Sequence, residues 1–322
     1  NWIKSFKGAM LLISHDREFL DECVESIVHI HNGTVELYKG NYSQFEIRKA
    51  AKLAEIESNY NKQQREISHM QDFVRRFKAK ATKARQAQSR IKALERMELI
   101  APAHIDSPFQ FSIPETEKIS NPLITLENAN LGYTDPVLNN VKVAFRPGDR
   151  IGLLGVNGAG KSTFVKSLKG DLELLEGQKI EGKNLKIGYF SQHQVDDLML
   201  DKSPIDHLVK VKEKASESEI RNFLGGFNFR GDKAKENIKN FSGGEKARLA
   251  LSVIAFQKPN LLLMDEPTNH LDMDMRQALT VALQDFSGAI VLISHDRHLL
   301  ANTVDEFLII NEGKVERFNG DL

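Results

Sequence analysis

Short apolar runs that end at polar clusters dominate the second half of the chain. Three of them, at residues 150–154, 261–265 and 290–293, are rich in Leu, Ile and Val and run directly into glycine, acidic or histidine-containing segments. Apolar runs of this length are typical of buried strands, and helical patterns lie between them. The pattern predicts an α/β fold with parallel strands over residues 122–322.

Residues 44–100 follow a different pattern. No Pro or Gly occurs between Gly40 and Pro102, and Ala, Lys, Arg, Gln and Glu dominate, with apolar side chains recurring sparsely near helical spacing. These residues favour helices, and a narrow apolar stripe provides one packing seam. We therefore predict a long antiparallel helical hairpin, a coiled coil, joined to the α/β domain by a proline-containing loop over residues 101–121.

A phosphate-binding loop follows the first of the three apolar runs. Gly155 to Ser162, with the sequence GVNGAGKS, matches the pattern G-x-x-x-x-G-K-[ST] at every fixed position, and a helical run begins at Ser162. Glycines let backbone N–H groups approach phosphate oxygens, and the helix N-terminus adds partial positive charge. Lys161 is placed to reach the β- and γ-phosphates, and Ser162 to ligate Mg²⁺. The motif predicts binding of a nucleoside triphosphate.

Two acids follow one another at the end of the second apolar run. Asp265 is suited to hold Mg²⁺, and Glu266 to polarise an attacking water. Neighbouring residues of a strand point to opposite faces, so we expect the strand to end near Asp265 if both carboxylates are to reach one site.

Two further motifs allow a structural and a functional interpretation. Ser242-Gly243-Gly244-Glu245 predicts a capping box at a helix start and, equally, a second phosphate-binding helix N-terminus. His295 follows the third apolar run. A lone histidine there is more often structural, but α/β sites lie at the ends of parallel strands, where an imidazole can donate to a γ-phosphate.

Together these motifs resemble the ATP-binding cassette superfamily over about 200 residues, from Asn121 to Leu322. Gly155 to Thr163 resembles Walker A, Leu261 to Glu266 resembles Walker B, and Ser242 to Glu245 resembles the signature motif, although Phe241 stands where Leu is usual. The resemblance implies a P-loop NTPase cassette with a helical subdomain that binds ATP and Mg²⁺ and hydrolyses ATP.

The resemblance also assigns roles to individual residues. It implies catalytic roles for Glu266, His295 and Gln192, and metal ligation by Ser162, Gln192 and Asp265. The residues that it implies for ATP binding are Tyr133, Gly155, Asn157, Gly158, Ala159, Gly160, Lys161, Ser162, Thr163, Ser242, Gly243, Gly244, Glu245 and Asp272. In the family two cassettes close head to tail, so the signature residues would touch ATP held by a partner cassette.

The segment Pro267 to Asp272, PTNHLD, is similar to the soluble, translation-associated F subfamily, and the whole chain most resembles its YheS-type branch. In that subfamily the linker between two cassettes is a helical arm that reaches into the ribosome beside the transfer RNA in the peptidyl site. The resemblance implies that residues 44–100 are such an arm, with ribosomal RNA and peptidyl-site transfer RNA as partners and regulation of translation as the function.

The charge of the predicted arm is one-sided. Residues 73–92 contain eight cations and no acid, whereas the whole chain of 322 residues balances 44 cations against 44 acids. A solvated charged helix is the alternative, but like charges this dense repel one another unless a polyanion neutralises them. The candidate RNA contacts are Arg75, Arg76, Lys78, Lys80, Lys83 and Arg85.

The chain repeats itself at an offset of 280 residues. Residues 1–42 and 281–322 align without gaps and share 16 identities, including the segment ISHDR at Ile13 and Ile293. We therefore expect residues 1–43 to be the tail of a first cassette, and the chain to be a piece of a tandem-cassette protein. On this view residues 10–14 form a strand separated from its sheet, and His15 is a relic. Hydrolysis would be weak without the missing first cassette or a second copy.

Composition sets further bounds. No run of 18 apolar residues exists, and one cysteine, Cys23, excludes an internal disulfide and fits a cytoplasmic location. Two alternative functions remain: the ATPase subunit of a membrane transporter, which the basic arm argues against, and a DNA-binding, repair-associated ATPase, because a basic hairpin can also grip DNA phosphates.

Overall fold

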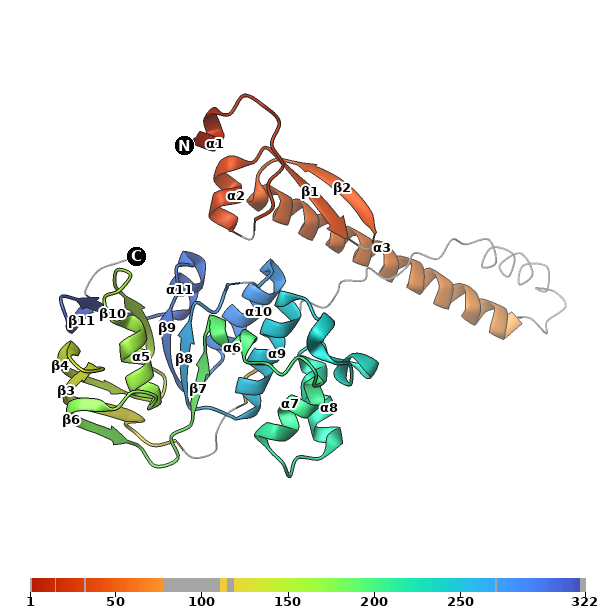
Figure 1. The fold of residues 1–322 in the computed structure, drawn as a ribbon. Helices are drawn as coiled ribbons and strands as arrows, with labels where there is room; N and C mark the ends of the chain where they lie inside the picture. Colours follow the sequence, from red (N-terminus) through yellow and green to blue (C-terminus); the bar gives the residue numbers. More distant parts are fainter. Residues whose placement is uncertain are drawn as a thin grey trace. The chain divides into compact units, whose positions relative to one another are not determined.

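Residues 1–107 and 108–322 form two compact units (Figure 1). The computed structural model describes residues 2–14, 16–31, 33–77, 111–114, 119–269 and 271–318.

A six-stranded sheet forms the centre of the second unit, with the strand order β11-β10-β5-β9-β8-β7. The strands β10, β5, β9, β8 and β7 run parallel, and β11 pairs antiparallel with β10. Their bounds are β5 Arg150–Leu154, β7 Ile187–Phe190, β8 Leu261–Asp265, β9 Ala289–Ile293, β10 Glu306–Asn311 and β11 Lys314–Phe318. The three predicted apolar runs therefore become neighbouring strands β5, β9 and β8, so that their carboxyl ends share one edge of the sheet.

Alternate side chains of these strands serve two separate cores. Leu262 and Met264 of β8 pack into a core with the helices on one face of the sheet, whereas Leu261 and Leu263 pack into a core on the other face. The first face is covered by α9, α10 and α11, and the second by α5 (Figure 1). The helix bounds are α5 Lys161–Lys169, α9 Gly243–Phe256, α10 Met273–Gln284 and α11 Arg297–Thr303.

A second, antiparallel sheet completes the α5 side of this unit. Its order is β4-β3-β6, with bounds β3 Ile124–Gly132, β4 Pro136–Phe145 and β6 Leu174–Glu181. Phe145 of β4 and Phe164 of α5 are fully buried, with ring centroids 6.4 Å apart. The antiparallel sheet therefore buries one face against the helix that follows the phosphate loop.

Short helices form the remaining part of the second unit. They are α6 Gln192–Asp196, α7 Pro204–Val211, α8 Glu217–Gly226 and the 3₁₀ turns Gly231–Ala234 and Ile238–Asn240. Phe111 packs on Phe227, with ring centroids 4.8 Å apart, and is buried in the same core as α8 and α9. Part of the segment that we expected to be a connecting loop thus belongs to the second unit, because one buried aromatic ring fixes it there.

The first unit contains a hairpin and a long helix. Its elements are α1 Trp2–Ser5, α2 Arg17–Cys23, β1 Ser26–His31, β2 Thr34–Lys39 and α3 Tyr42–Phe77. The ring of Phe45, in the first turn of α3, lies 5.0 Å from that of Tyr38 and 5.2 Å from that of His29. The expectation of a strand over residues 10–14 was wrong: these residues have no regular structure, because no neighbouring strand pairs with them in the described part of this unit. The second helix of the predicted hairpin, residues 78–100, lies outside the described residues.

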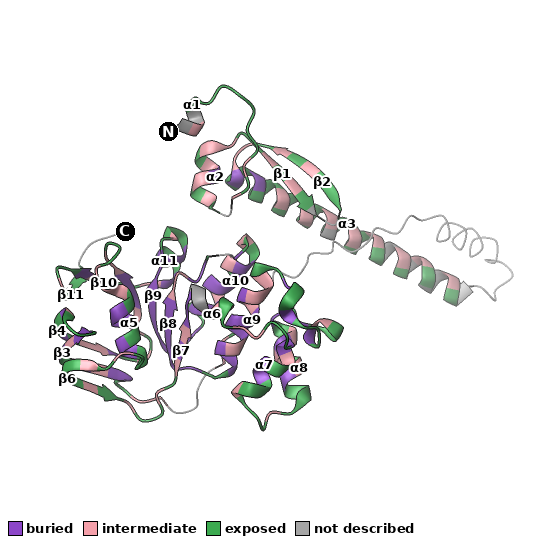
Figure 2. Cartoon of the chain, in the orientation of Figure 1, coloured by how far each residue is buried: buried purple, intermediate pink, exposed green. Residues whose placement is uncertain are grey.

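The internal repeat extends from sequence to structure. At the offset of 280, α2 and the hairpin β1–β2 correspond to α11 and the hairpin β10–β11, with the same starts for each element. Figure 2 shows buried residues along β8 and β9, whereas β1 and β2 carry mainly intermediate and exposed residues. The same local fold therefore occurs twice, once within a six-stranded sheet and once, among the described residues of the first unit, as a two-stranded sheet.

Candidate functional site

The phosphate loop lies between β5 and α5, as predicted. Gly158 and Gly160 adopt φ values of 83° and 111°, in the left-handed region that favours glycine. A side chain built on Gly158 would meet no atom within 4 Å, so the loop presents an open backbone surface there. The Lys161 ammonium donates to the carbonyls of Gly155, at 2.6 Å, and Val156, at 3.1 Å.

The N-terminus of α5 is built to receive an anion. Gly160 is its N-cap and offers no side-chain hydrogen bond to the first turn, and no acidic residue lies in that turn. The first N–H groups of a helix need partners from outside the helix, and a phosphate group supplies them. Lys161, Ser162 and Thr163, the predicted phosphate and metal contacts, all lie in this turn.

Strand β8 ends at Asp265, as predicted, and the chain turns sharply at the next residue. Glu266 has φ 50°, a conformation that residues other than glycine rarely adopt. Its backbone N–H donates to the carbonyl of Ile293, at 2.9 Å. Neighbouring residues of a strand point to opposite faces, but Glu266 lies in the turn after the strand. Both carboxylates therefore lie at the carboxyl edge of the sheet.

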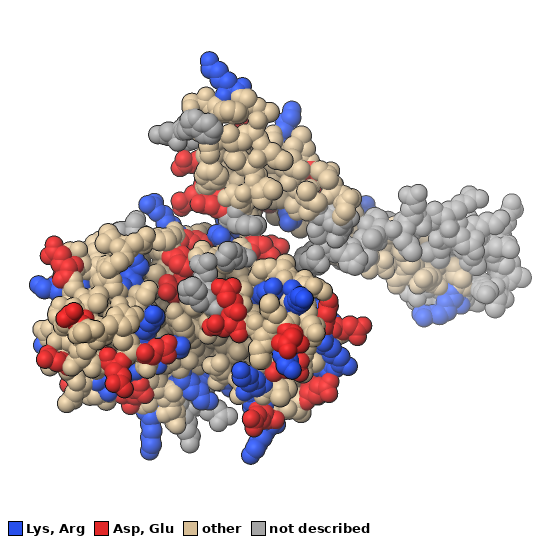
Figure 3. All heavy atoms as spheres, viewed as in Figure 1, with Lys and Arg blue, Asp and Glu red and all other residues tan. Residues whose placement is uncertain are grey.

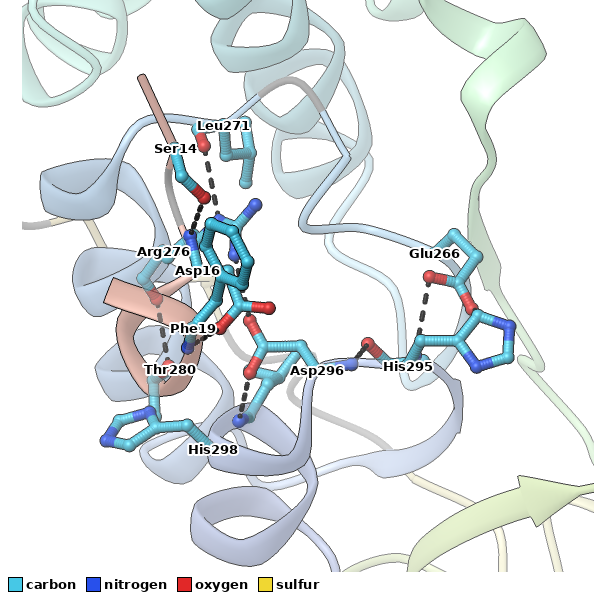
Figure 4. Close-up of polar contacts among 12 residues, drawn as sticks. Ser14, Asp16, Phe19, Glu266, Leu271, Arg276, Thr280, His295, Asp296 and His298 are labelled. Carbon is cyan, nitrogen blue, oxygen red and sulfur yellow. Dashed lines mark hydrogen bonds and ion pairs between the residues drawn. The ribbon is translucent and has the colours of Figure 1, made fainter. Parts of the chain in front are cut away.

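Glu266 and His295 face each other across this edge (Figure 4). The imidazole Nε2 lies 3.7 Å from Oε1 of Glu266, and the backbone N–H of His295 donates to Oε2 at 3.4 Å. Oε1 is buried and accepts no hydrogen bond from the described part of the chain, whereas the His295 side chain is 80% exposed. Burial raises the pKa of the Glu266 carboxyl, although His295 and Lys161 act in the opposite direction. A carboxylate with these properties is suited to accept a proton from, or orient, a water molecule.

The signature segment forms the predicted capping box. Oγ of Ser242 accepts the Glu245 N–H at 3.3 Å, and Oε2 of Glu245 accepts the Ser242 N–H at 2.8 Å, at the start of α9. Lys233 donates to the other carboxylate oxygen of Glu245. Burial opposes ionisation, but the hydrogen bonds from Lys233 and Ser242 hold the pKa of Glu245 below its usual range. A side chain at Gly243 would meet nothing within 4 Å, so this helix start is also open to an approaching group.

The remaining predicted residues occupy separate places. Tyr133 follows β3 and is 60% exposed, and Lys166 of α5 donates to its hydroxyl at 3.4 Å. Asp272 caps α10 and accepts the Met275 N–H at 2.8 Å. Gln192 begins α6, but its side chain lies outside the described residues. The predicted contacts of Tyr133, Asp272 and Gln192 with nucleotide or metal stay predictions.

The donor groups at the sheet edge suit a magnesium ion that arrives with phosphates. Ser162 and Asp265 offer a hydroxyl and a carboxylate, which are oxygen ligands that Mg²⁺ prefers. Within the described residues no group of three His, Cys, Asp or Glu side chains could hold a metal by itself. This donor set fits Mg²⁺ shared between protein and substrate phosphates.

The predicted RNA contacts lie mostly beyond the described part of the chain. Arg75 is exposed near the end of α3, and of Arg76 only the backbone is described. Lys78, Lys80, Lys83 and Arg85 lie outside the described residues. None of the helices that the structure describes combines the length and the hydropathy needed to span a bilayer.

Known proteins resemble this chain along its whole length. Two family models, each described as ABC transporter, match residues 28–111 and 138–269. The chain belongs to the ATP-binding cassette family. The probable ATP-binding protein YheS of Escherichia coli (strain K12) is 54% identical over 322 residues, which are 100% of this chain and 50% of that protein.

Two further similarities refine the family assignment. ABC transporter F family member 3 of Arabidopsis thaliana is 36% identical, covering 99% of this chain and 44% of that protein, which supports the F subfamily. The chain spans about half the length of the curated relatives it matches. A solved structure titled "Structure of ATP binding subunit of ABC transporter" has a TM-score of 0.55 and 25% identity, over 61% of this chain and 89% of that one. The predicted cassette fold is confirmed by these findings.

Sequence reasoning missed three polar side chains that contact the predicted motifs. Lys233 holds Glu245, Lys166 reaches Tyr133, and Arg276 contacts both Leu271 and Asp296. No motif marks them in the sequence, because each acts across a distance set by the fold.

Proposed function

We propose that the chain binds MgATP at the phosphate loop and hydrolyses it with Glu266 as the residue that orients or activates water. The observation that carries the proposal is the convergence of three strand ends: the phosphate loop after β5, Glu266 after β8 and His295 after β9. Ligands of open α/β sheets bind at this edge. Mg²⁺ would neutralise charge on the transferred phosphoryl group, with Ser162 and Asp265 as its protein ligands.

Each residue has a distinct task in this proposal. Lys161 would exchange its carbonyl partners for phosphate oxygens, and His295, which is exposed beside Glu266, would contact the γ-phosphate. The open helix start at Ser242 and Gly243 would meet ATP on a second cassette. Hydrolysis in this chain alone would therefore be weak, and it would rise when two copies associate.

Calorimetry with MgATP tests the binding step. Lys161→Ala is expected to weaken affinity by about tenfold or more, because a charge-assisted bond to phosphate is lost. Lys169→Ala, on the last turn of the same helix, is the matched control and is expected to retain the wild-type affinity. Undiminished ATP affinity in Lys161→Ala would overturn the proposed site.

Turnover measurements test the hydrolytic step. Glu266→Gln is expected to retain ATP binding and to lose turnover by about 100-fold or more. Glu316→Gln, an exposed acid on β11, is the control. Specific activity of the wild type is expected to rise with chain concentration, as a site shared between two copies requires. Vigorous turnover by a strict monomer would contradict the shared site.

We further propose that this F-subfamily protein binds the ribosome through residues 44–100 and regulates translation in the cytoplasm. The support is the 36-residue helix α3, the exposed Arg75 near its end, and the eight cations without an acid in residues 73–92. On the second unit, by contrast, cations and anions are interspersed over the face in view (Figure 3). A one-sided basic segment on a neutral chain favours a polyanionic partner.

Sedimentation of Glu266→Gln with ribosomes and ATP tests this partner. Comigration that weakens as salt rises is expected, and it should fail when Lys78, Lys80 and Lys83 are replaced by Gln. Replacement of Lys210, Lys214 and Lys239, which lie on the second unit, is the control with the same charge change. Preferential binding to branched DNA would favour a repair role instead, and exclusive recovery with membranes would favour a transporter subunit.

A further inference from the structure

The guanidinium of Arg276 joins two loops of the candidate site. Its Nε donates to the carbonyl of Leu271 at 3.2 Å, and its Nη1 lies 3.4 Å from Oδ2 of Asp296 (Figure 4). The two side chains are partly buried, with 25% of Arg276 and 17% of Asp296 exposed. An ion pair at this depth is screened less than an exposed surface pair, and its planar donor group fixes geometry as well as charge.

Both contacted loops hold residues of the proposed ATPase site. Leu271 directly precedes Asp272, the N-cap of α10, and Asp296 is the N-cap of α11 and directly follows His295. The helices α10 and α11 pack against each other. Arg276 therefore ties the segment that follows β8 to the segment that follows β9.

The internal repeat forms the same cap at both aspartates. In the first unit Asp16 accepts the Phe19 N–H at 3.0 Å, and its own N–H donates to Ser14 at 3.1 Å. In the second unit Asp296 accepts the Leu299 N–H at 3.0 Å and donates to Ser294 at 3.0 Å. The cap uses only Oδ1 of either aspartate. The hydrogen bonds of each cap thus come from residues near the aspartate in sequence, and in the second unit Arg276 adds a contact through Oδ2.

His295 depends on its backbone for its position. Its side chain is 80% exposed, and its two contacts with Glu266 are long, at 3.4 Å and 3.7 Å. A shift of the loop by a fraction of an ångström would break both contacts. The loop is fixed on one side by β9 and on the other by the Asp296 cap that Arg276 holds.

We propose that Arg276 is a positioning residue, which sets His295 against Glu266 by holding the loops after β8 and β9 in a fixed relation. The proposal rests on the ATP hydrolysis proposed above for the same site. Arg276 acts on the site through its contacts with Leu271 and Asp296.

Steady-state turnover tests the effect on chemistry. Arg276→Met is expected to lower kcat by about tenfold with little change in KM, because misplacing a reacting group costs rate more than binding. Asp296→Asn retains a capping side chain but loses the ion pair, and it is expected to lower kcat to the same extent as Arg276→Met. The double variant should lose no more than the larger single loss. Arg276→Lys should recover part of kcat, and Arg221→Met, at an exposed ion pair of α8, is the control.

Hydrogen exchange separates this inference from the hydrolysis on which it rests. In the chain without nucleotide, Arg276→Met is expected to speed amide exchange in residues 294–297 by about tenfold and to leave residues 155–163 unchanged. Unchanged exchange at residues 294–297 would overturn the inference, whether or not the chain turns over ATP. Faster exchange there in a chain that never hydrolyses ATP would support the positioning and refute the ATPase proposal. Faster exchange throughout the second unit would show a general loss of stability and would also refute the inference.

Discussion

The two copies of the repeat have similar sequences but very different surroundings. In the second unit Ile293 ends β9 and is 4% exposed, and Ile310 of β10 is 1% exposed. Their counterparts in the first unit, Ile13 and Ile30, are 92% and 72% exposed. In the second copy β9 and β10 both pair with β5, whereas residues 10–14 of the first have no strand beside them in the described part of the chain.

The difference shows which features the repeat encodes locally. The aspartate cap, the short helix and the hairpin form in both units, because their hydrogen bonds lie within a few residues. The strand before the cap forms only in the second unit, because a strand needs hydrogen-bond partners from distant segments. Apolar side chains in the first copy are exposed for the same reason, and such a surface favours association.

The largest expected contrast concerns the two histidines. His295→Ala is expected to lower ATP turnover by about 100-fold or more, because it removes the imidazole beside Glu266. His15→Ala is expected to leave turnover at the phosphate loop of the second unit unchanged, since His15 belongs to the first copy of the repeat. Parallel turnover assays check the pair, and a comparable loss in both variants would show that the first copy also serves a site.

Burial sets the next contrast. Ile293→Ala is expected to lower the free energy of unfolding of the second unit by about 2–4 kcal/mol, through lost burial and a cavity. Ile13→Ala, at an exposed position, should change stability by less than about 0.5 kcal/mol. Denaturant titrations of the two variants measure both values. A large cost for Ile13→Ala would reveal a partner that covers residues 10–14 in solution.

The aspartate caps allow a closer comparison. Asp296→Ala is expected to cost about 2 kcal/mol, and Asp16→Ala about 1 kcal/mol, because both lose a cap and Asp296 also loses its ion pair with Arg276. Amide exchange within α11 and α2 measures the loss in each helix. Equal losses would mean that the ion pair contributes nothing to the stability of α11.

The smallest expected effect is a gain in stability at Glu266. Burial raises its pKa in the folded chain, so the ionised carboxylate opposes folding at neutral pH. The protonated carboxyl of Glu266 favours folding. This contribution to stability is complete below the usual pKa of about 4.3, and it is lost as pH rises through the raised pKa. Glu266→Gln should therefore be more stable than wild type at pH 7, and the two should converge near pH 4. Thermal denaturation across this range checks the sign.

Most of the cassette was predictable from sequence because its signals are local. The apolar runs gave strands β5, β8 and β9, and the motif GVNGAGKS gave the loop between β5 and α5. The capping box at Ser242 and Glu245 was also predicted and is confirmed. These features depend on residues within one turn or one strand of each other.

Contacts between segments distant in sequence were not predictable in the same way. The left-handed turn at Glu266 and the contact between Glu266 and His295 depend on the pairing of β8 with β9. Arg276 belongs to the same class, because its partner Asp296 lies 20 residues further along the chain. The prediction of a strand over residues 10–14 was wrong for a related reason. The sequence of these residues favours a strand, but a strand requires a neighbouring strand with which to pair.

The hydrogen bonds that Lys161 makes within the phosphate loop affect how ATP affinity should be measured. Because the Lys161 ammonium donates to two backbone carbonyls, a triphosphate bound at the proposed site would compete with them rather than with water alone. Any heat of ATP binding is therefore a difference between two sets of hydrogen bonds. Truncating this side chain would leave the two carbonyl oxygens in need of other donors. The stability of Lys161→Ala without nucleotide should therefore be compared with that of the wild type before any loss of ATP affinity is assigned to phosphate contacts.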